Sequence, residues 1–303
     1  MIDEKIIYDA KNLNKNQLVL DIETTGLSRQ FDTIVMIGMI YYEQKNFFIR
    51  QIFATNDQQE KDLLIIFKNI SKDKQIITYN GDSFDLEFIN QRLINNNLEA
   101  IFFENTIDIY KVVRDYQKFF NFPSLKLDYI ETLLDIKRVE DDRKRVVSKL
   151  SKEVLVRDNP TPIIKHNRND VISTEKLITI EDVFTYKLSF YSKFLDANLC
   201  LKNSIIEKNL IHLTYISSIK LNKSFYEFSD FCISIDEYQV NIRINVLYGK
   251  ISENNFGYVV KNIFKLEDKS SYDISKDYLL FKNSNTYLYK NINAHTRKIL
   301  ESI

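Results

Sequence analysis

Two carboxylates that lie two positions apart are the first indication of chemistry in this sequence. Asp21 and Glu23 follow an apolar run and are separated by Ile22. Because side chains of an extended strand alternate between its two faces, both acids point to the same side. Residues 24–26, Thr-Thr-Gly, end the strand in a tight turn. Two acids at such a strand end suit a divalent metal with oxygen ligands, or they are incidental acids on a solvated strand end.

Two further stretches carry acids that could converge on this pair. Asp85 lies in the expected first turn of a helix, shortly after a strand that ends at residue 79. His166 and Asp170 are four positions apart, so on a helix they share one face at a separation of about 6 Å along the axis. The alternatives are that Asp85 only stabilises a helix N-terminus and that His166 and Asp170 face solvent.

Taken together, these residues suit the hydrolysis of a phosphodiester. Four acids at strand ends and helix turns could hold two divalent cations roughly 3.5–4 Å apart. Such a pair activates a water molecule and stabilises the leaving oxygen of an in-line phosphoryl displacement. A histidine one helical turn from a metal ligand is well placed to accept the proton of that water.

The elements that must position these residues form a mixed α/β architecture. Apolar runs and a short polar connection predict an antiparallel meander of three strands, followed by alternating helices and strands. Ser83 is expected to cap the helix that contains Asp85. In chain order, we expect strands at 17–22, 33–42 and 46–53, a helix at 58–70, a strand at 75–79, a helix after 83, a strand at 106–110, and helices near 110–120, 125–136 and 163–180.

A change of pattern after about residue 185 predicts a second region. We place the boundary within 182–205, which divides the chain into 1–185 and a β-rich region at 186–303 whose role the sequence does not specify. The expected elements are strands at 224–234, 238–247 and 278–281 and a helix at 291–301. The aromatic residues of this region could stack bases, although core and cross-strand packing is their commoner use.

The composition restricts the class of protein and its partners. Hydrophobic residues make up 44% of the chain and the formal net charge is zero, so a packed core is expected and any nucleic-acid contact must come from a local patch. Cys200 and Cys232 are expected to be buried thiols in a reducing compartment. The sequence has no signal-peptide pattern and no apolar run long enough to span a membrane, so we expect a soluble, cytoplasmic protein.

Two basic segments are candidates for contact with phosphates. The stretch 137–152 is rich in lysine and arginine and either steers a phosphate backbone or forms a solvated loop. Lys111, Arg114 and Lys118 recur at helical spacing, with Tyr110 and Phe119 nearby. For this group we favour a solvated helix face with aromatic residues in the core behind it.

In their order and spacing, these motifs resemble the DEDD superfamily of 3′–5′ exonucleases, which have a ribonuclease H-like fold, and more narrowly its YprB-like branch. The resemblance covers roughly residues 15–182. It implies a mixed sheet of three antiparallel strands followed by parallel strands, flanked by helices. The motifs that carry it are Asp21-Ile-Glu23-Thr-Thr-Gly-Leu, Tyr79-Asn-Gly-Asp-Ser-Phe-Asp85, Ile107-Asp108-Ile-Tyr110, Arg138-Val-Glu-Asp141-Asp142 and His166-Asn-Arg-Asn-Asp170-Val171.

The resemblance also implies a role for individual residues. The metal ligands for two Mg²⁺ or Mn²⁺ ions would be Asp21, Glu23, Asp85 and Asp170, and the general base would be His166. Thr24 and Leu27 match positions that hold the terminal nucleotide, and Asn80 and Ser83 match polar positions near the substrate backbone. Asp108 matches a recurring acid that would at most support the ligands from behind.

Two departures from the family pattern affect these expectations. His166 precedes the last acid by four residues, whereas the widely known histidine variant has a spacing of five. Asp141-Asp142 is followed by Arg143-Lys-Arg145, where the branch tends to have Pro-Gly. Even with these departures, the resemblance implies a metal-dependent 3′–5′ exonuclease acting on a single-stranded 3′ end of DNA or RNA. The alternative is a catalytically weak nucleic-acid-binding or scaffold protein on the same fold.

Overall fold

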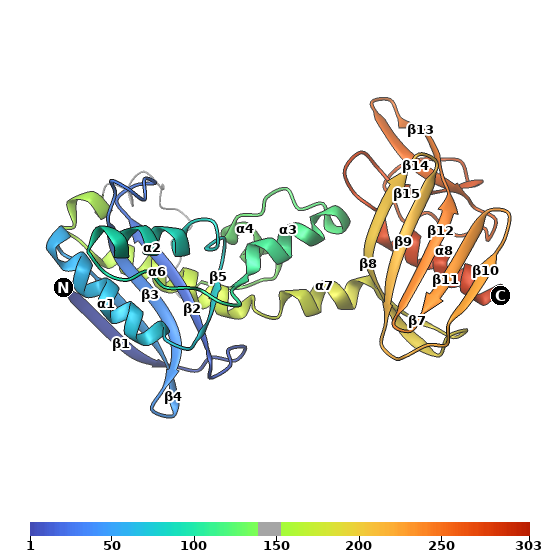
Figure 1. Ribbon diagram of the computed structural model, residues 1–303. Coiled ribbons are helices and arrows are strands. Elements are labelled where there is room, and N and C mark those ends of the chain that lie inside the picture. Colours follow the sequence, from blue (N-terminus) through green and yellow to red (C-terminus); the bar gives the residue numbers. More distant parts are fainter. Residues whose placement is uncertain (139–152) are drawn as a thin grey trace. The chain divides into compact units, whose positions relative to one another are not determined.

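The computed structural model describes residues 1–138 and 153–303 and divides into two units (Figure 1). The first unit comprises residues 1–114 and 124–180, and the second comprises 115–123 and 181–303. Each unit has its own sheet or sheets and its own buried residues. A short segment of the N-terminal half of the chain therefore belongs to the second unit.

A six-stranded mixed sheet forms the centre of the first unit, with the strand order β1-β4-β3-β2-β5-β6. Neighbours from β1 to β2 are antiparallel, whereas β2, β5 and β6 are parallel, as the sequence predicts. The strand β1 was not predicted because it is a mostly exposed edge strand without regular alternation. The strands are β1 (Ile2–Tyr8), β2 (Gln17–Thr24), β3 (Ile34–Glu43), β4 (Asn46–Phe53), β5 (Gln75–Thr78) and β6 (Ile107–Asp108).

Helices cover both faces of this sheet (Figure 1). On one face, Leu63, Phe67 and Phe88 of α1 and α2 join a core cluster with β2 and β3. On the other, Ile163 of α6 packs near Met36 of β3. Because both faces of β3 are buried, its run of apolar residues is nearly continuous, as predicted. The helices are η1 (Asp57–Gln59), α1 (Glu60–Ser71), α2 (Asp85–Asn95), α3 (Ile109–Phe120), α4 (Leu127–Leu133) and α6 (Thr161–Lys176).

Three local expectations for this unit are wrong. Ser83 does not cap α2, because its hydroxyl donates instead to the carbonyl oxygen of Asn80 at 3.2 Å and to its side-chain oxygen at 3.0 Å. The helix expected at 163–180 ends at residue 176, and a turn separates it from α7 (Ile180–Leu188). The helix α4 is shorter than the range 125–136 that its period suggests.

Antiparallel sheets dominate the second unit, as expected for a β-rich region. A six-stranded sheet has the order β10-β11-β12-β9-β8-β7, and a three-stranded sheet has the order β13-β14-β15. The segment 224–234 holds two strands rather than one, because the chain turns at 228–230. The elements are β7 (Ser189–Ser192), β8 (Ala197–Glu207), β9 (Leu210–Ser217), β10 (Ser224–Glu227), β11 (Phe231–Asp236), β12 (Gln239–Asn245), β13 (Leu247–Ser252), β14 (Asn255–Lys261), β15 (Tyr278–Lys282) and α8 (Tyr289–Glu301).

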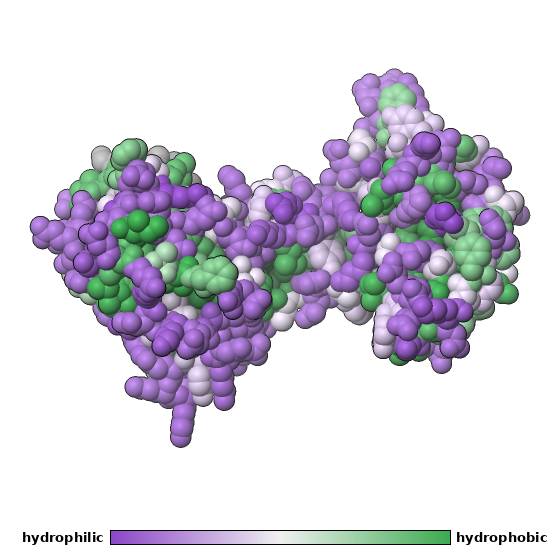
Figure 2. All heavy atoms as spheres, in the orientation of Figure 1, coloured by the Kyte–Doolittle hydropathy of each residue, from purple (hydrophilic) through white to green (hydrophobic). Residues whose placement is uncertain are grey.

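Both cysteines are free thiols, but only one is fully buried. Cys200 is buried in β8, whereas Cys232 is half-buried in β11, where the Arg243 side chain donates to its sulfur at 3.0 Å. The expectation that both are buried is therefore wrong for Cys232. Figure 2 shows mostly hydrophilic groups on the visible face of each unit, with smaller apolar areas between them.

Within the described ranges 1–138 and 153–303, no helix has the length and apolar character needed to cross a lipid bilayer.

Candidate active site

Asp21 and Glu23 lie near the carboxyl end of β2, and Ile22 between them is buried in the core. Asp85 is the first residue of α2, and its Oδ1 accepts a hydrogen bond from the Ile22 backbone N–H at 3.1 Å. Since Ile22 separates the two acids of β2, this bond fixes the start of α2 directly beside them. The sequence placed Asp85 in a first helical turn, and the structure confirms that position.

Asn167 of α6 joins that helix to the same strand. It is fully buried, and its side-chain N–H group donates to Asp21 Oδ2 at 2.8 Å and to the Asp21 carbonyl oxygen at 3.2 Å. Its own side-chain oxygen accepts a hydrogen bond from Gln51 Nε2 at 3.0 Å. Asn167 therefore holds the carboxylate of Asp21 in one orientation.

A glycine makes this close approach possible. Gly38 of β3 pairs with Asp21 on one side and with Gln51 on the other. A Cβ atom at Gly38 would lie 1.9 Å from the side-chain oxygen of Asn167, so α6 reaches the sheet only where this side chain is missing. The sequence analysis gave no role to Asn167, Gly38 or Gln51. The available signal was an isolated glycine inside an otherwise apolar strand.

Asp170 and His166 lie one turn apart on α6, as their spacing predicts. Asp170 Oδ2 is 3.4 Å from His166 Nε2, and its Oδ1 is 2.9 Å from a guanidinium nitrogen of Arg138. Arg138 also donates to Glu131 of α4 at 2.8 Å, and the Glu131 side chain is fully buried. Arg138 thus bridges two acids and points into the protein, so it cannot steer the phosphate backbone of a nucleic acid toward the site. The remaining basic residues predicted at 139–152 lie outside the described residues.

The four acids on β2, α2 and α6 form one electrostatic cluster. Burial raises the pKa of Asp21 well above its usual value, and the charges of Asp170, Asp85 and Glu23 raise it further. Burial, followed by the charges of Asp170 and Asp85, raises the pKa of Glu23 to about 8. Burial also raises the pKa of Asp85 to about 7, against the effect of the Ile22 hydrogen bond. The pKa of Asp170 is raised by burial and held down by His166 and Arg138.

This cluster fits divalent cations by its chemistry, and its side chains would have to reorient to bind them. Four carboxylates, of which Asp21 and Glu23 have pKa values raised by the charges of the others, provide the negative oxygen donors that such ions prefer. Even so, no group of three or more His, Cys, Asp or Glu side chains in the described residues is already arranged as a metal site. Hydrogen bonds and ion pairs to Ile22, Asn167 and Arg138 occupy several of the oxygens.

The residues expected near a substrate lie at the end of β2 and in the loops that follow β2 and β5. Thr24 donates to the Gly26 carbonyl oxygen at 2.7 Å and so shapes the first loop, from which the Leu27 side chain projects with 84% of its surface exposed. Asn80 and Ser83 are exposed in the second loop. Both loops follow the carboxyl ends of parallel strands, where open α/β sheets usually bind their ligands.

Asp108 supports the second loop through hydrogen bonds to its backbone and is not one of the four clustered acids. It is buried at the end of β6 and accepts hydrogen bonds from the backbone N–H groups of Asn80 at 2.7 Å, Asp82 at 3.3 Å and Tyr110 at 3.0 Å. Asn80 has a positive φ of 68°, a conformation that asparagine tolerates better than most residues. A single carboxylate thereby joins the β5–α2 loop to the start of α3.

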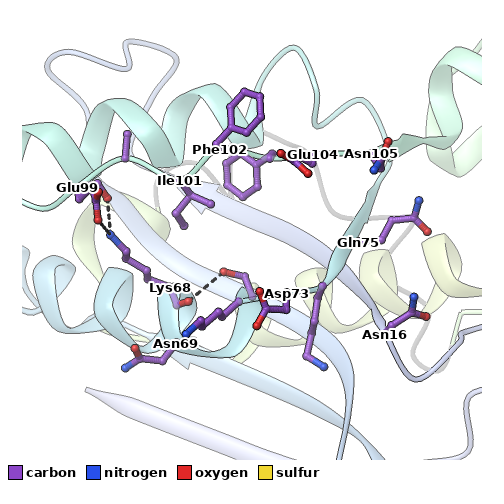
Figure 3. A pocket seen from close by; sticks show the side chains of 15 residues that line it. Asn16, Lys68, Asn69, Asp73, Gln75, Glu99, Ile101, Phe102, Glu104 and Asn105 are labelled. Atoms are coloured by element: carbon purple, nitrogen blue, oxygen red, sulfur yellow. Dashed lines mark hydrogen bonds and ion pairs between the residues drawn. The ribbon is translucent and has the colours of Figure 1, made fainter.

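A large cavity of the first unit lies away from the acids. It has a volume of about 950 Å³ and is lined by Asn16 and Gln75, at the amino ends of β2 and β5, and by Lys68 and Phe102 among others (Figure 3). Lys68 and Glu99 both line this cavity and form an ion pair with a distance of 3.2 Å. The acids lie toward the opposite, carboxyl ends of the same strands, so this cavity is not part of the candidate site.

The part of the chain that contains the mixed sheet and the four acids matches a known protein family. Residues 18–180 match the model of a family described as the RNase_H superfamily. The chain belongs to the RNase H superfamily. The match includes α2, α6 and nearly all of β2, and therefore all four clustered acids, together with the strands β3 to β6 of the mixed sheet. The YprB-like branch is a finer assignment that this match does not reach.

Similar proteins come from DNA metabolism. One relative, a PolC-type DNA polymerase III of Ureaplasma parvum serovar 3, is 31% identical in an alignment of 118 residues that covers 31% of this chain and 8% of the polymerase. A structure of exonuclease I has a TM-score of 0.38 at 12% identity and covers 66% of this chain. The zinc-bound complex of E. coli exonuclease I with single-stranded DNA has a TM-score of 0.34 at 13% identity and covers 67%. This RNase H superfamily chain covers 54% of each exonuclease I chain.

Proposed function

We propose that this protein is a metal-dependent nuclease of DEDD type, in the YprB-like branch, that removes nucleotides from the 3′ end of DNA or RNA. The observation that carries the proposal is the cluster of Asp21, Glu23, Asp85 and Asp170 at the carboxyl end of the sheet. The superfamily match supports it because the match spans all four acids. The polymerase relative and the exonuclease I complex with single-stranded DNA support a nucleic-acid substrate.

In this proposal the four acids hold two Mg²⁺ or Mn²⁺ ions. When bound, such ions supply an activated water and neutralise the charge that develops on the leaving oxygen. Asn167 keeps Asp21 oriented through its 2.8 Å hydrogen bond, and the Ile22 N–H does the same for Asp85. The protein thus fixes two of the four ligands through contacts that do not depend on the ions.

His166 is the proposed proton acceptor. Its side chain is partly exposed, and the nitrogen that faces the cluster is 3.4 Å from Asp170. That nitrogen must part from Asp170 before it can accept a proton from water, and a cation held by Asp170 would allow this separation. Thr24 and Leu27 would contact the terminal nucleotide, and Asn80 and Ser83 would contact the backbone behind it.

The test is release of nucleotides from single-stranded DNA and RNA labelled at the 5′ end, with Mn²⁺ or Mg²⁺ and with a chelator. We expect stepwise shortening from the 3′ end that requires the metal. Asp21→Asn should reduce the rate by roughly 100-fold or more, because it removes a charged ligand without changing the size of the side chain. Shortening that survives both the chelator and Asp21→Asn would refute the proposal.

One observation favours a second candidate, a protein that binds nucleic acid on the same fold with little turnover. Arg138 lies against Asp170, and the described residues hold no metal-binding group that is already assembled. A cation on Asp170 must compete with this guanidinium for the same oxygen. Tight binding of single strands without any release, even at millimolar Mn²⁺, would establish this candidate in place of the nuclease.

A further inference from the structure

An open cavity lies next to the loop that joins β5 to α2. Its volume is about 510 Å³, and its lining residues come from the end of β5, the start of α3 and the segment that leads into α4. These residues are Tyr79, Asn80, Tyr110, Leu125, Lys126 and Leu127. Because β5 and β6 are parallel and both end here, the cavity lies at the same end of the sheet as the clustered acids.

The walls of this cavity are fixed by the protein itself. Asp108 accepts hydrogen bonds from the backbone N–H groups of Asn80 and Tyr110, so one buried carboxylate holds two walls. The Tyr79 hydroxyl donates to the Leu125 carbonyl oxygen at 2.5 Å and so joins the segment before α4 to the residues that follow β5. A ligand therefore meets a preformed surface and does not have to order it, which reduces the free-energy cost of binding.

Aromatic rings and cations meet at this surface. The rings of Tyr79 and Tyr110 lie edge to face, with centroids 6.0 Å apart and planes at 77°. The Arg114 guanidinium lies 6.0 Å from the centroid of the Tyr110 ring, and Lys126 is exposed at the rim. Lys111 is also near, but its ion pair with Asp82 at 2.5 Å neutralises its charge.

This combination suits one type of ligand. The half-buried Tyr110 ring can stack on a flat, uncharged ring of a ligand, and Arg114 beside it can pair with an anionic group of the same ligand. Stacked bases and phosphates of a single strand carry both groups, and stacking on an aromatic side chain accepts any base. The sequence analysis favoured a solvated helix face for this group. Phe119 is indeed in the core, but Tyr110 lines the cavity.

We infer that this cavity is a subsite for a nucleotide upstream of the scissile bond of a single strand. Its base stacks on Tyr110, and Arg114 and Lys126 contact the adjoining phosphates. The inference rests on the proposed function for the direction of the strand. Asn80, which lines the cavity, lies in the loop that ends at Asp85, the first residue of α2, so the subsite adjoins the acid cluster. A strand whose 3′ end reaches the acids would thus pass the cavity within its last few nucleotides.

The inference is tested by binding alone, in chelator, so that no turnover occurs. Fluorescence anisotropy would measure the affinity for a set of labelled ten-nucleotide strands in which one abasic nucleotide moves stepwise from the 3′ end. For the wild type, we expect one position near the 3′ end at which loss of the base weakens binding by about tenfold. Tyr110→Leu should weaken binding of the intact strand by the same factor. The affinity of this variant should not fall further when the nucleotide at that position is abasic.

Matched variants separate this result from a general loss of structure or charge. Phe102→Leu removes a ring that is 85% exposed at the cavity on the opposite end of the sheet, and it should bind like the wild type (Figure 3). Lys126→Gln should lower the slope of log K against log salt by about one, whereas Lys72→Gln at that other cavity should not. Thermal unfolding would verify that every variant is folded.

The outcomes distinguish the subsite from the proposed nuclease activity. If Tyr110→Leu binds every strand like the wild type, or keeps the full abasic effect, the subsite is refuted even though 3′ release continues. If the abasic effect is present and depends on Tyr110 but no metal condition produces release, the subsite holds and the nuclease proposal fails. If the wild type binds no single strand in chelator, or shows no position at which loss of the base weakens binding, the subsite is refuted and the metal-dependent release assay alone decides the nuclease proposal.

Discussion

At the scale of single residues, Gly38 decides how closely α6 approaches the sheet. The row Asp21, Gly38 and Gln51 crosses three strands, and Asn167 lies on it with hydrogen bonds to both ends. A side chain in the middle of this row would push Asn167 away from Asp21. The orientation of a proposed metal ligand therefore depends on a residue that carries no functional group.

We expect Gly38→Ala to destabilise the protein by about 1–3 kcal/mol, because the new methyl group overlaps the Asn167 side chain. It should also reduce nuclease activity, since Asp21 loses its fixed partner. Denaturant unfolding and the 3′-release assay would measure the two effects. The control is Gly249→Ala in β13, where an added Cβ meets no atom within 4 Å. Equal stability of both variants would contradict this account of Gly38.

A second residue-scale prediction concerns His295 of α8. Its ring is buried between the rings of Phe264 and Phe281, with centroids 5.2 and 5.4 Å away. Burial lowers its pKa to about 4, and the Lys261 backbone offsets only part of this effect. Between pH 6.5 and 4 the unfolded chain therefore binds more protons than the folded protein. Stability should fall as the pH is lowered through this window, by at most about 3 kcal/mol.

His295→Phe should remove that part of the pH dependence, because a phenyl ring cannot be protonated. Urea unfolding at pH 7 and at pH 4.5 would measure it as a smaller difference in unfolding free energy between the two conditions. A variant at 295 with an unchanged slope would show that other groups cause the acid sensitivity.

At the scale of elements, the sequence predicts the strands and helices that have strong patterns, but not the contacts between them. The strands β2 to β5 and the helices α1, α3 and α8 follow from apolar runs and helical periods. The order of the motifs also predicts that the acids of β2, α2 and α6 converge. The hydrogen bonds of Asn167 and Gln51 join segments more than a hundred positions apart. They depend on where α6 crosses the sheet, which no local pattern specifies.

The loop between β5 and α2 allows a prediction at this scale. Asp108→Asn replaces one acceptor oxygen by an N–H group that faces backbone donors, so at least one of its three hydrogen bonds must be lost. We expect a loss of about 1–3 kcal/mol in stability and faster hydrogen exchange at the Asn80 and Tyr110 amides. Exchange at the amides of β3 should change only in proportion to global stability. Unchanged exchange at both loop amides would contradict the proposed support by Asp108.

At the scale of the whole molecule, the segment 115–123 belongs to the second unit although it precedes much of the first. Its aromatic rings pack on residues of that unit. Phe120 and Phe122 lie 5.0 and 5.6 Å from the Phe184 ring, and Phe119 lies 6.1 Å from Tyr287. A boundary near residue 185 is visible in the sequence as a change of pattern. The assignment of 115–123 to the second unit is not visible in the sequence, because the apolar period of a helix does not show which segments the helix packs against.

We expect a fragment of residues 186–303 to fold poorly, because it lacks both Phe184 and the aromatic segment that covers this part of the unit. Circular dichroism and thermal unfolding should show a broad transition for the fragment in place of a cooperative one. Addition of a peptide spanning 109–124 to a fragment of 181–303 should sharpen the transition. Cooperative unfolding of 186–303 by itself would show that the segment is dispensable.

The late position of α6 in the chain has a consequence for synthesis on the ribosome. The sheet with Asp21, Gly38 and Gln51 emerges first, and the helix that brings Asn167 to this row follows more than a hundred residues later. Until then, Gln51 and the Asp21 carboxylate have to rely on water for the hydrogen bonds that Asn167 will provide. The nascent chain therefore completes its acid cluster only when translation has passed well beyond residue 170 and the ribosomal exit tunnel has released α6.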